Sequence, residues 1–92
     1  MLDEGIIGQI MLFTSTWNRP IRNWVPCDGR DLQFKKYIAL SAVLGIPIPE
    51  HHKEMSYSDY PEDLTFKVPN IPSPHPALTY YICVQGIFPT GY

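Results

Sequence analysis

Cysteine and histidine are the residues of this chain best suited to chemistry, and it holds two cysteines and three histidines. A thiolate nucleophile needs a neighbouring base, and that base is normally oriented by a third group. The spacing places no histidine beside Cys27, and no orienting residue is evident. We therefore predict no catalytic thiol.

A metal site has little support for a similar reason. Cys27 and Cys83 lack the paired C-x₂₋₄-C spacing of structural zinc sites, and the adjacent His51 and His52 would point to different sides of a regular element. The two cysteines could form a bridge if their strands are neighbours. A reducing compartment would instead keep them as buried free thiols, which is the reading we favour.

Other motifs of catalysis are missing from the sequence. It contains no Gly-rich phosphate loop, no nucleophile elbow and no His-Glu metal motif. The acidic residues Asp59, Glu62 and Asp63 lie in a stretch without periodicity, where a solvated surface explains them. We predict that the protein is not an enzyme and uses no cofactor.

Length and composition predict one domain, residues 1–92, with 45% hydrophobic and 17% charged residues. The formal net charge of −2 provides no basic surface for nucleic acid. No apolar run approaches the roughly 18–20 residues that span a bilayer. Asp3 and Glu4 precede the first apolar residues, so we expect no signal peptide, synthesis in a cytoplasm and no membrane insertion.

The secondary structure expected from the sequence is that of an α+β fold. It has a small, mostly antiparallel sheet, one packed helix and long proline-rich loops. Residues 6–14 carry apolar side chains on both faces and predict a strand covered on each side. Residues 24–27 predict a second strand, in which Pro26 indicates a sheet edge. Asp28-Gly29 predicts a hairpin turn, because this turn needs the positive φ that glycine allows.

The rest of the chain predicts a returning arm, a helix and two further strands. The arm covers residues 30–32, and the later strands cover residues 65–68 and 78–86, the last of them interior to the sheet. Apolar residues at helical spacing predict a helix over residues 33–44, with Asp31 as its N-cap and Gly45 just after its end.

Residues 46–64 form a long segment without periodicity, and such loops often serve binding. We expect Tyr57 and Tyr60 to contact a partner, since aromatic residues are enriched at interfaces, together with His51 and His52. The alternative is a solvated loop with incidental tyrosines. Seven of the ten prolines lie between residues 47 and 76, and three of them fall in residues 70–76, which should form an extended, rigid bridge.

Three segments, taken in order, carry a family resemblance. The first is Gly8-Gln-Ile-Met-Leu-Phe13. The second is Trp24-x-x-Cys27-Asp28-Gly29-Arg30, with a helix ending at Leu44-Gly45. The third joins Phe66-x-Val68-Pro69-Asn70 to Tyr81-Ile82-x-x-Gln85-Gly86-Ile87-Phe88-Pro89. Together they resemble the phage tail collar domain family, over almost the whole chain.

The resemblance implies a structural protein of the phage virion, located in the tail as a fibre, collar or baseplate component and made in the bacterial cytoplasm. It implies protein–protein contacts with other tail or fibre proteins, and self-association as a trimer. The alternatives are a tip protein that binds a host-surface glycan or receptor, and a chaperone that assists tail-fibre assembly without entering the virion.

The resemblance also implies a framework of motif residues. One set builds the hairpin, and the other closes the sheet beneath it. They are Trp24, Cys27, Asp28 and Gly29 in the first set, and Gln85, Gly86, Phe88 and Pro89 in the second.

Overall fold

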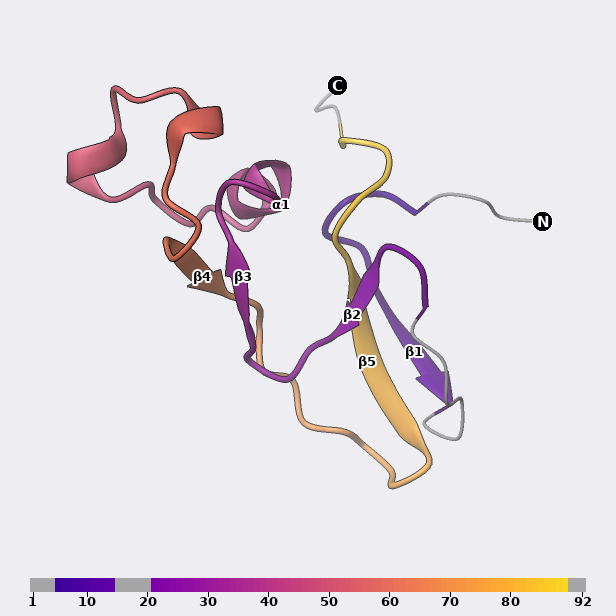
Figure 1. The fold of residues 1–92 in the computed structure, drawn as a ribbon. Helices are drawn as coiled ribbons and strands as arrows, with labels where there is room; N and C mark the ends of the chain where they lie inside the picture. Colours follow the sequence, from indigo (N-terminus) through magenta and orange to yellow (C-terminus); the bar gives the residue numbers. More distant parts are fainter. Residues whose placement is uncertain (1–4, 15–20, 90–92) are drawn as a thin grey trace.

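The structure is a computed structural model that describes residues 5–14 and 21–89, apart from the side chain of Tyr57. Two separate antiparallel sheets and one short helix make up its core elements (Figure 1). In chain order the elements are β1 (Ile10–Thr14), β2 (Trp24–Pro26), β3 (Asp31–Gln33), α1 (Ile38–Val43), the 3₁₀ turns η1 (Glu50–His52) and η2 (Tyr57–Asp59), β4 (Thr65–Lys67) and β5 (Leu78–Cys83). The predicted α+β class is confirmed.

The three-stranded sheet has the order β1-β5-β2, with both pairs antiparallel. β5 is the central strand, and Ile82 stands opposite Ile10 on one side and Val25 on the other. The interior position predicted for the last strand is therefore confirmed. Pro26 lies on the edge strand β2, where its missing N–H costs the ladder least, also as predicted.

Asp28-Gly29 does not close a hairpin, which corrects the prediction. β2 pairs with β5, whereas residues 31–33 leave this sheet and pair with β4 in the two-stranded sheet. The reason is that both sides of the turn bond to distant segments. The Cys27 N–H donates to the Tyr80 carbonyl at 2.9 Å, and the Arg30 carbonyl accepts from the Val68 N–H at 3.0 Å. The turn is thus a corner between two sheets.

The helix is shorter than predicted and starts at Ile38 rather than Gln33. Gln33 belongs to β3, and the Asp31 carboxylate accepts a hydrogen bond from Lys67 Nζ at 2.9 Å instead of capping the helix. Pairing with β4 has therefore overridden the local helix signal. The predicted end is confirmed, since Gly45 follows Leu44 with a φ of +72°.

The first strand also differs from its prediction. It begins at Ile10, because Gly8, with a φ of +92°, turns the chain just before it. Ile6 instead forms a parallel bridge with Ile87. The expected cover on both faces is absent: Ile10, Met11 and Leu12 are 40%, 39% and 41% exposed.

The core joins the two sheets to α1 and to the loop after it. Phe34 and Phe66 pack with ring centroids 5.0 Å apart, and Leu40 and Ile82 are fully buried. The shape is elongated, with extents of 43 × 28 × 22 Å and a radius of gyration of 14.2 Å, above the roughly 12 Å typical of this length.

Candidate functional site

The corner formed by residues 24–30 joins the two sheets and carries the first set of predicted motif residues. Gly29 has a φ of +79°, a conformation that favours glycine. Asp28 forms an antiparallel bridge with Asn70, and the Ile71 N–H donates to the Cys27 carbonyl at 2.9 Å. The corner is therefore anchored to the proline-rich segment that leads from β4 to β5.

An ion pair lies on the outside of the corner. The Arg30 guanidinium donates to both carboxylate oxygens of Asp28, from Nε at 3.0 Å and from Nη2 at 2.9 Å. These hydrogen bonds lower the pKa of the Asp28 carboxyl below its ordinary value and raise that of Arg30. Both side chains are nearly half exposed, so the pair contributes at most about 1 kcal/mol. The geometry of this ion pair fits a role in stabilising the corner.

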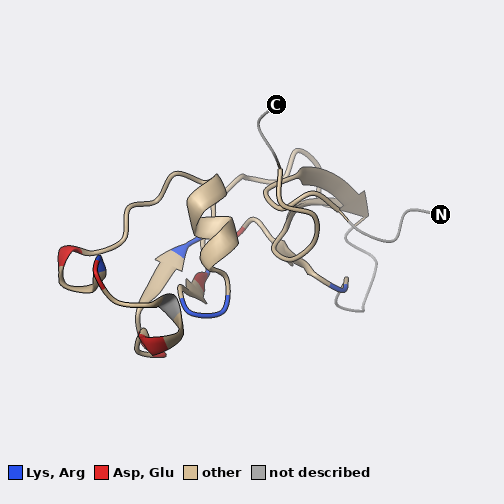
Figure 2. Ribbon diagram, turned by 90° about the horizontal axis from the view of Figure 1, so that it is seen from above, with Lys and Arg blue, Asp and Glu red and all other residues tan. Residues whose placement is uncertain are grey.

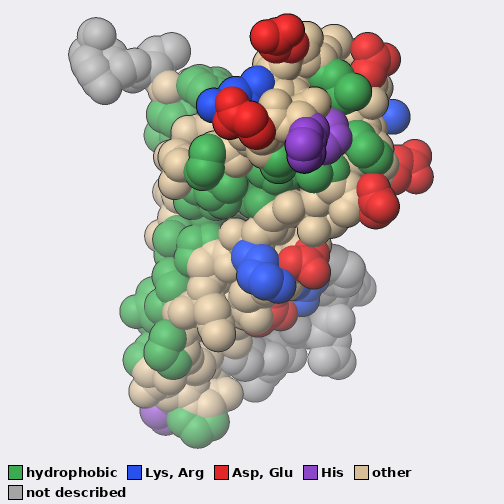
Figure 3. Space-filling view, turned by 90° about the vertical axis from the view of Figure 1, so that its left-hand side faces the viewer, with side chains coloured by type: hydrophobic (Ala, Val, Ile, Leu, Met, Phe, Trp, Pro, Cys, Tyr) green, Lys and Arg blue, Asp and Glu red, His purple; other side chains and the backbone are tan. Residues whose placement is uncertain are grey.

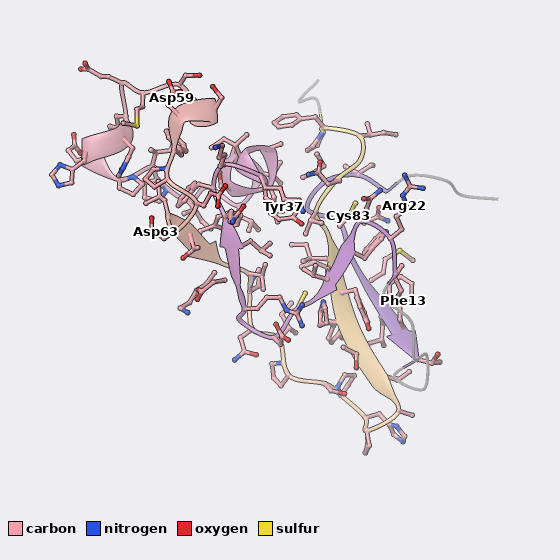
Figure 4. All side chains as sticks on the ribbon, in the orientation of Figure 1. Phe13, Arg22, Tyr37, Asp59, Asp63 and Cys83 are labelled. Atoms are coloured by element: carbon pink, nitrogen blue, oxygen red, sulfur yellow. The ribbon has the colours of Figure 1, made fainter. Side chains whose placement is uncertain are left out.

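Cys27 and Cys83 are buried free thiols in the structure. Burial raises the pKa of both, and at Cys27 the nearby Asp28 carboxylate adds to this rise. The Cys83 Sγ donates to the Gln85 carbonyl at 3.1 Å. Cys83 is the last residue of β5 and is labelled in Figure 4. Both groups are therefore protonated at neutral pH and act as small packing residues.

The second set of predicted motif residues, near the C-terminus, does not lie beneath the corner. It packs against residues 5–7 instead: the Ile7 N–H donates to the Ile87 carbonyl at 2.8 Å, and the Ile87 N–H donates to the Gly5 carbonyl at 3.0 Å. Gly86 lies so close to the backbone of Gly5 that a Cβ on Gly86 would be 2.2 Å from the Gly5 carbonyl oxygen. This differs from the expectation because Ile7 carried only the signal of the predicted strand over residues 6–14, and Gly5 carried no signal for pairing with the C-terminal segment.

The remaining members of that set lie nearer the surface. Gln85 Nε2 donates to the Lys36 carbonyl at 3.2 Å, which ties this segment to the turn before α1. Phe88 is 49% exposed and Pro89 is half-buried. Of these residues, Gln85 and Gly86 have contacts that fit a framework role.

The loop of residues 46–64 holds the four predicted partner contacts, and the structure separates them. Tyr60 is only 3% exposed and packs edge-on against Phe34, with ring centroids 6.5 Å apart. The expectation that Tyr60 lies free for a partner is therefore wrong, because its ring completes the aromatic core. Tyr57 lies in η2, and its side chain is outside the described part of the chain.

The two histidines of this loop differ from each other. His51 is exposed, whereas His52 is half-buried, with its ring centroid 5.9 Å from that of Tyr60. His52 Nδ1 is buried, and none of the described residues offers it a hydrogen-bond partner. Among the described residues no group of His, Cys, Asp and Glu side chains is arranged to hold a metal ion.

Charge is concentrated at the end of the molecule that carries this loop, as Figure 2 shows. Its exposed acidic residues are Glu50, Glu54, Asp59, Glu62 and Asp63. In Figure 3 most of the acidic side chains on this face lie in its upper part, and in Figure 4 the labelled Asp59 and Asp63 lie far from Phe13 on β1. As predicted from the sequence, Asp59, Glu62 and Asp63 lie on a solvated surface.

The three-stranded sheet, at the opposite end of the molecule, is built from uncharged strands. β1, β2 and β5 contain no charged residue. Phe13 packs edge-on against Trp24 and Tyr81, with ring centroids 5.5 and 5.2 Å apart, while its neighbours on β1 are exposed. The exposure of this strand was not predicted from the sequence, because its uninterrupted apolar pattern is equally typical of a buried strand.

Searches of curated proteins and of solved structures return no match to this chain. In the described part of the chain, no helix is long and apolar enough to cross a membrane.

One family model does match. It covers residues 8–47, which run from the turn before β1, through the corner, to just beyond α1. The first two segments quoted from the sequence lie inside this range, and the third lies outside it. The family is the Phage Tail Collar Domain, so the predicted resemblance is confirmed over these residues and indicates a structural protein of the phage tail.

Proposed function

We propose that this protein is a non-catalytic component of the tail fibre, collar or baseplate, and that it acts through contacts with other tail proteins. The observation that carries the proposal is the collar match over residues 8–47. The exposed apolar residues of β1 and the exposed Phe88 support it, since contiguous apolar surface often marks protein–protein contacts. The protein is made in the bacterial cytoplasm and ends in the virion.

Particle composition tests this proposal. Purified virions are disrupted, and the chain is quantified against the major tail proteins by mass spectrometry. We expect a fixed number of copies per particle that survives high-salt washing. Absence from washed virions, combined with abundance in the infected cell, would instead favour a chaperone of fibre assembly.

Host-glycan or receptor binding is the rival function, and it loses one expected contact residue. Tyr60 is in the core, and of the other three loop residues only His51 is exposed within the part described. A glycan array tests this reading directly. Specific glycan binding that disappears in His51→Ala, with the fold intact, would favour the rival over a purely structural role.

A further inference from the structure

The chain reverses its direction just before β1. The Gln9 N–H donates to the Ile6 carbonyl at 2.8 Å and closes a tight turn, and Gly8 provides the positive φ of +92° that such a turn needs. Residues 5–7 therefore run opposite to β1 (Figure 1). Because β1 and β5 are antiparallel, residues 5–7 run in the same direction as the chain that continues from β5.

This first segment is bonded to the continuation of β5 at Ile87. Ile6 and Ile87 form a parallel bridge. In it, the Ile87 N–H donates to the Gly5 carbonyl at 3.0 Å, and the Ile7 N–H donates to the Ile87 carbonyl at 2.8 Å. Ile7 is only 5% exposed and belongs to the core. We call residues 5–7, with their two hydrogen bonds to Ile87, the clamp.

The clamp lies in a tight space. A Cβ on Gly5 would be 2.7 Å from Trp24 Cζ2 and 3.0 Å from Cys83 Sγ, so the backbone of Gly5 lies directly against both side chains. Gly86 also approaches the Gly5 carbonyl too closely for any side chain. These contacts hold the clamp in place beside the end of β5, in addition to its hydrogen bonds.

The direction of the clamp decides how tension acts on it. Tension applied at residues 5 and 89 pulls the clamp and the segment around Ile87 in opposite directions, because the two segments are parallel. They must slide past each other, so both hydrogen bonds of Ile87 are loaded together. Without the clamp, the same tension would act on the start of β1 and the end of β5, which lie side by side. That pair would open one hydrogen bond at a time.

We propose that the clamp is a mechanical device that makes this fold resist tension applied through its two ends. It converts a sheet that would peel apart into one whose end must be sheared. A domain with this property passes tension between partners that hold its two ends without unfolding. The inference depends on strand direction and hydrogen bonds alone and goes beyond the proposed tail function.

Single-molecule force spectroscopy tests the clamp with two pulling directions. The whole chain is held first by handles at its two termini and then by handles on Thr14→Cys and Pro76→Cys, both at exposed positions. The second pair lies beside the end of the β1–β5 ladder where Thr14 faces Leu78, so it peels the sheet and leaves the clamp unloaded. We expect an unfolding force about twofold higher through the termini, since two hydrogen bonds must break at once.

One substitution separates the clamp from general stability. Ile87→Pro removes the N–H that donates to Gly5, at a side chain that is 54% exposed. It should lower the force measured through the termini and leave the force measured through residues 14 and 76 unchanged. Ile87→Ala is the matched control, because it keeps the N–H, and it should change neither force. The comparison of the two directions in the wild-type clamp stands even if Ile87→Pro folds poorly.

The proposal is overturned if the chain with an unaltered clamp unfolds through its termini at no higher force than through residues 14 and 76. It is overturned equally if Ile87→Pro leaves the force through the termini unchanged, or lowers both forces by the same factor, because the clamp would then have no direction-dependent effect. A loss in Ile87→Ala as large as that in Ile87→Pro would also overturn it, since the side chain and not the hydrogen bond would then carry the effect.

Discussion

The three-stranded and the two-stranded sheets differ in what they present to solvent. In the two-stranded sheet Leu32 and Phe66 point into the core, while Asp31 and Lys67 form an exposed ion pair at 2.9 Å. In the three-stranded sheet the edge strand β1 exposes apolar side chains and carries no charge. The smaller sheet thus buries its apolar side chains within one chain and exposes charged ones, whereas the larger one has exposed apolar surface suited to a further contact.

The largest expected effect is on the buried side chains of the two-stranded sheet. Phe66→Ala removes a ring from the aromatic core, where Phe66 is 5% exposed, and should cost about 3–5 kcal/mol of unfolding free energy. Leu12→Ala, on the exposed strand, should cost less than about 1 kcal/mol. Urea unfolding followed by circular dichroism measures both. Equal losses would show that the two sheets do not differ in this way.

The next effect concerns the close backbone contact between Gly86 and Gly5. Gly86→Ala brings a Cβ to 2.2 Å from the Gly5 carbonyl oxygen, so the backbone must move, and we expect a loss of about 3 kcal/mol. Gly45→Ala is the matched control. It also places alanine at a positive φ, but no atom of the described residues lies within 4 Å of the new Cβ. A similar loss in both variants would mean that conformation, and not the close approach, explains the cost.

The corner between the sheets should respond more weakly. Gly29→Val puts a β-branched residue at a φ of +79°, with Asn70 Cβ 3.4 Å from the new Cβ, and should cost about 2 kcal/mol. Gly29→Asn should cost less, since asparagine tolerates this conformation. Thermal unfolding ranks the two variants. An unchanged midpoint in Gly29→Val would remove the turn from the framework.

Cys27→Ala tests whether the corner cysteine is only a packing residue. We expect a loss of about 1 kcal/mol, because a small buried group is removed, with association and virion incorporation unchanged. Unfolding and sedimentation together measure this. Loss of function in a well-folded Cys27→Ala protein would instead require a chemical role for the thiol.

The smallest expected effect is that of the corner ion pair on acid stability. The pKa of Asp28 is lowered by Arg30 in the folded protein, so the pair stabilises the fold above the unfolded pKa of about 3.9. This contribution is lost as the pH falls from there through the lower folded pKa. Asp28→Asn should therefore reduce stability by less than about 1 kcal/mol at pH 7 and have no effect well below pH 3. A larger loss at low pH than at neutral pH would contradict this sign.

Local signals in the sequence determined the positions of most elements. Pro26 marks an edge, Gly45 marks the end of the helix, and the alternating residues of β5 mark a central strand. Each of these follows from a backbone restriction or a side-chain period that acts within a few residues. The collar resemblance rests on the same kind of short, ordered signal.

Only the tertiary structure decided how these elements pair. Asp28-Gly29 makes a turn in either arrangement, but the hydrogen bonds of Cys27 and Arg30 to distant strands make it a corner rather than a hairpin. Likewise, the composition of β1 allows a buried or an exposed strand, and Tyr60 could lie in the loop surface or in the core. The physical reason is that strand pairing and burial depend on residues far apart in the sequence, which no local pattern specifies.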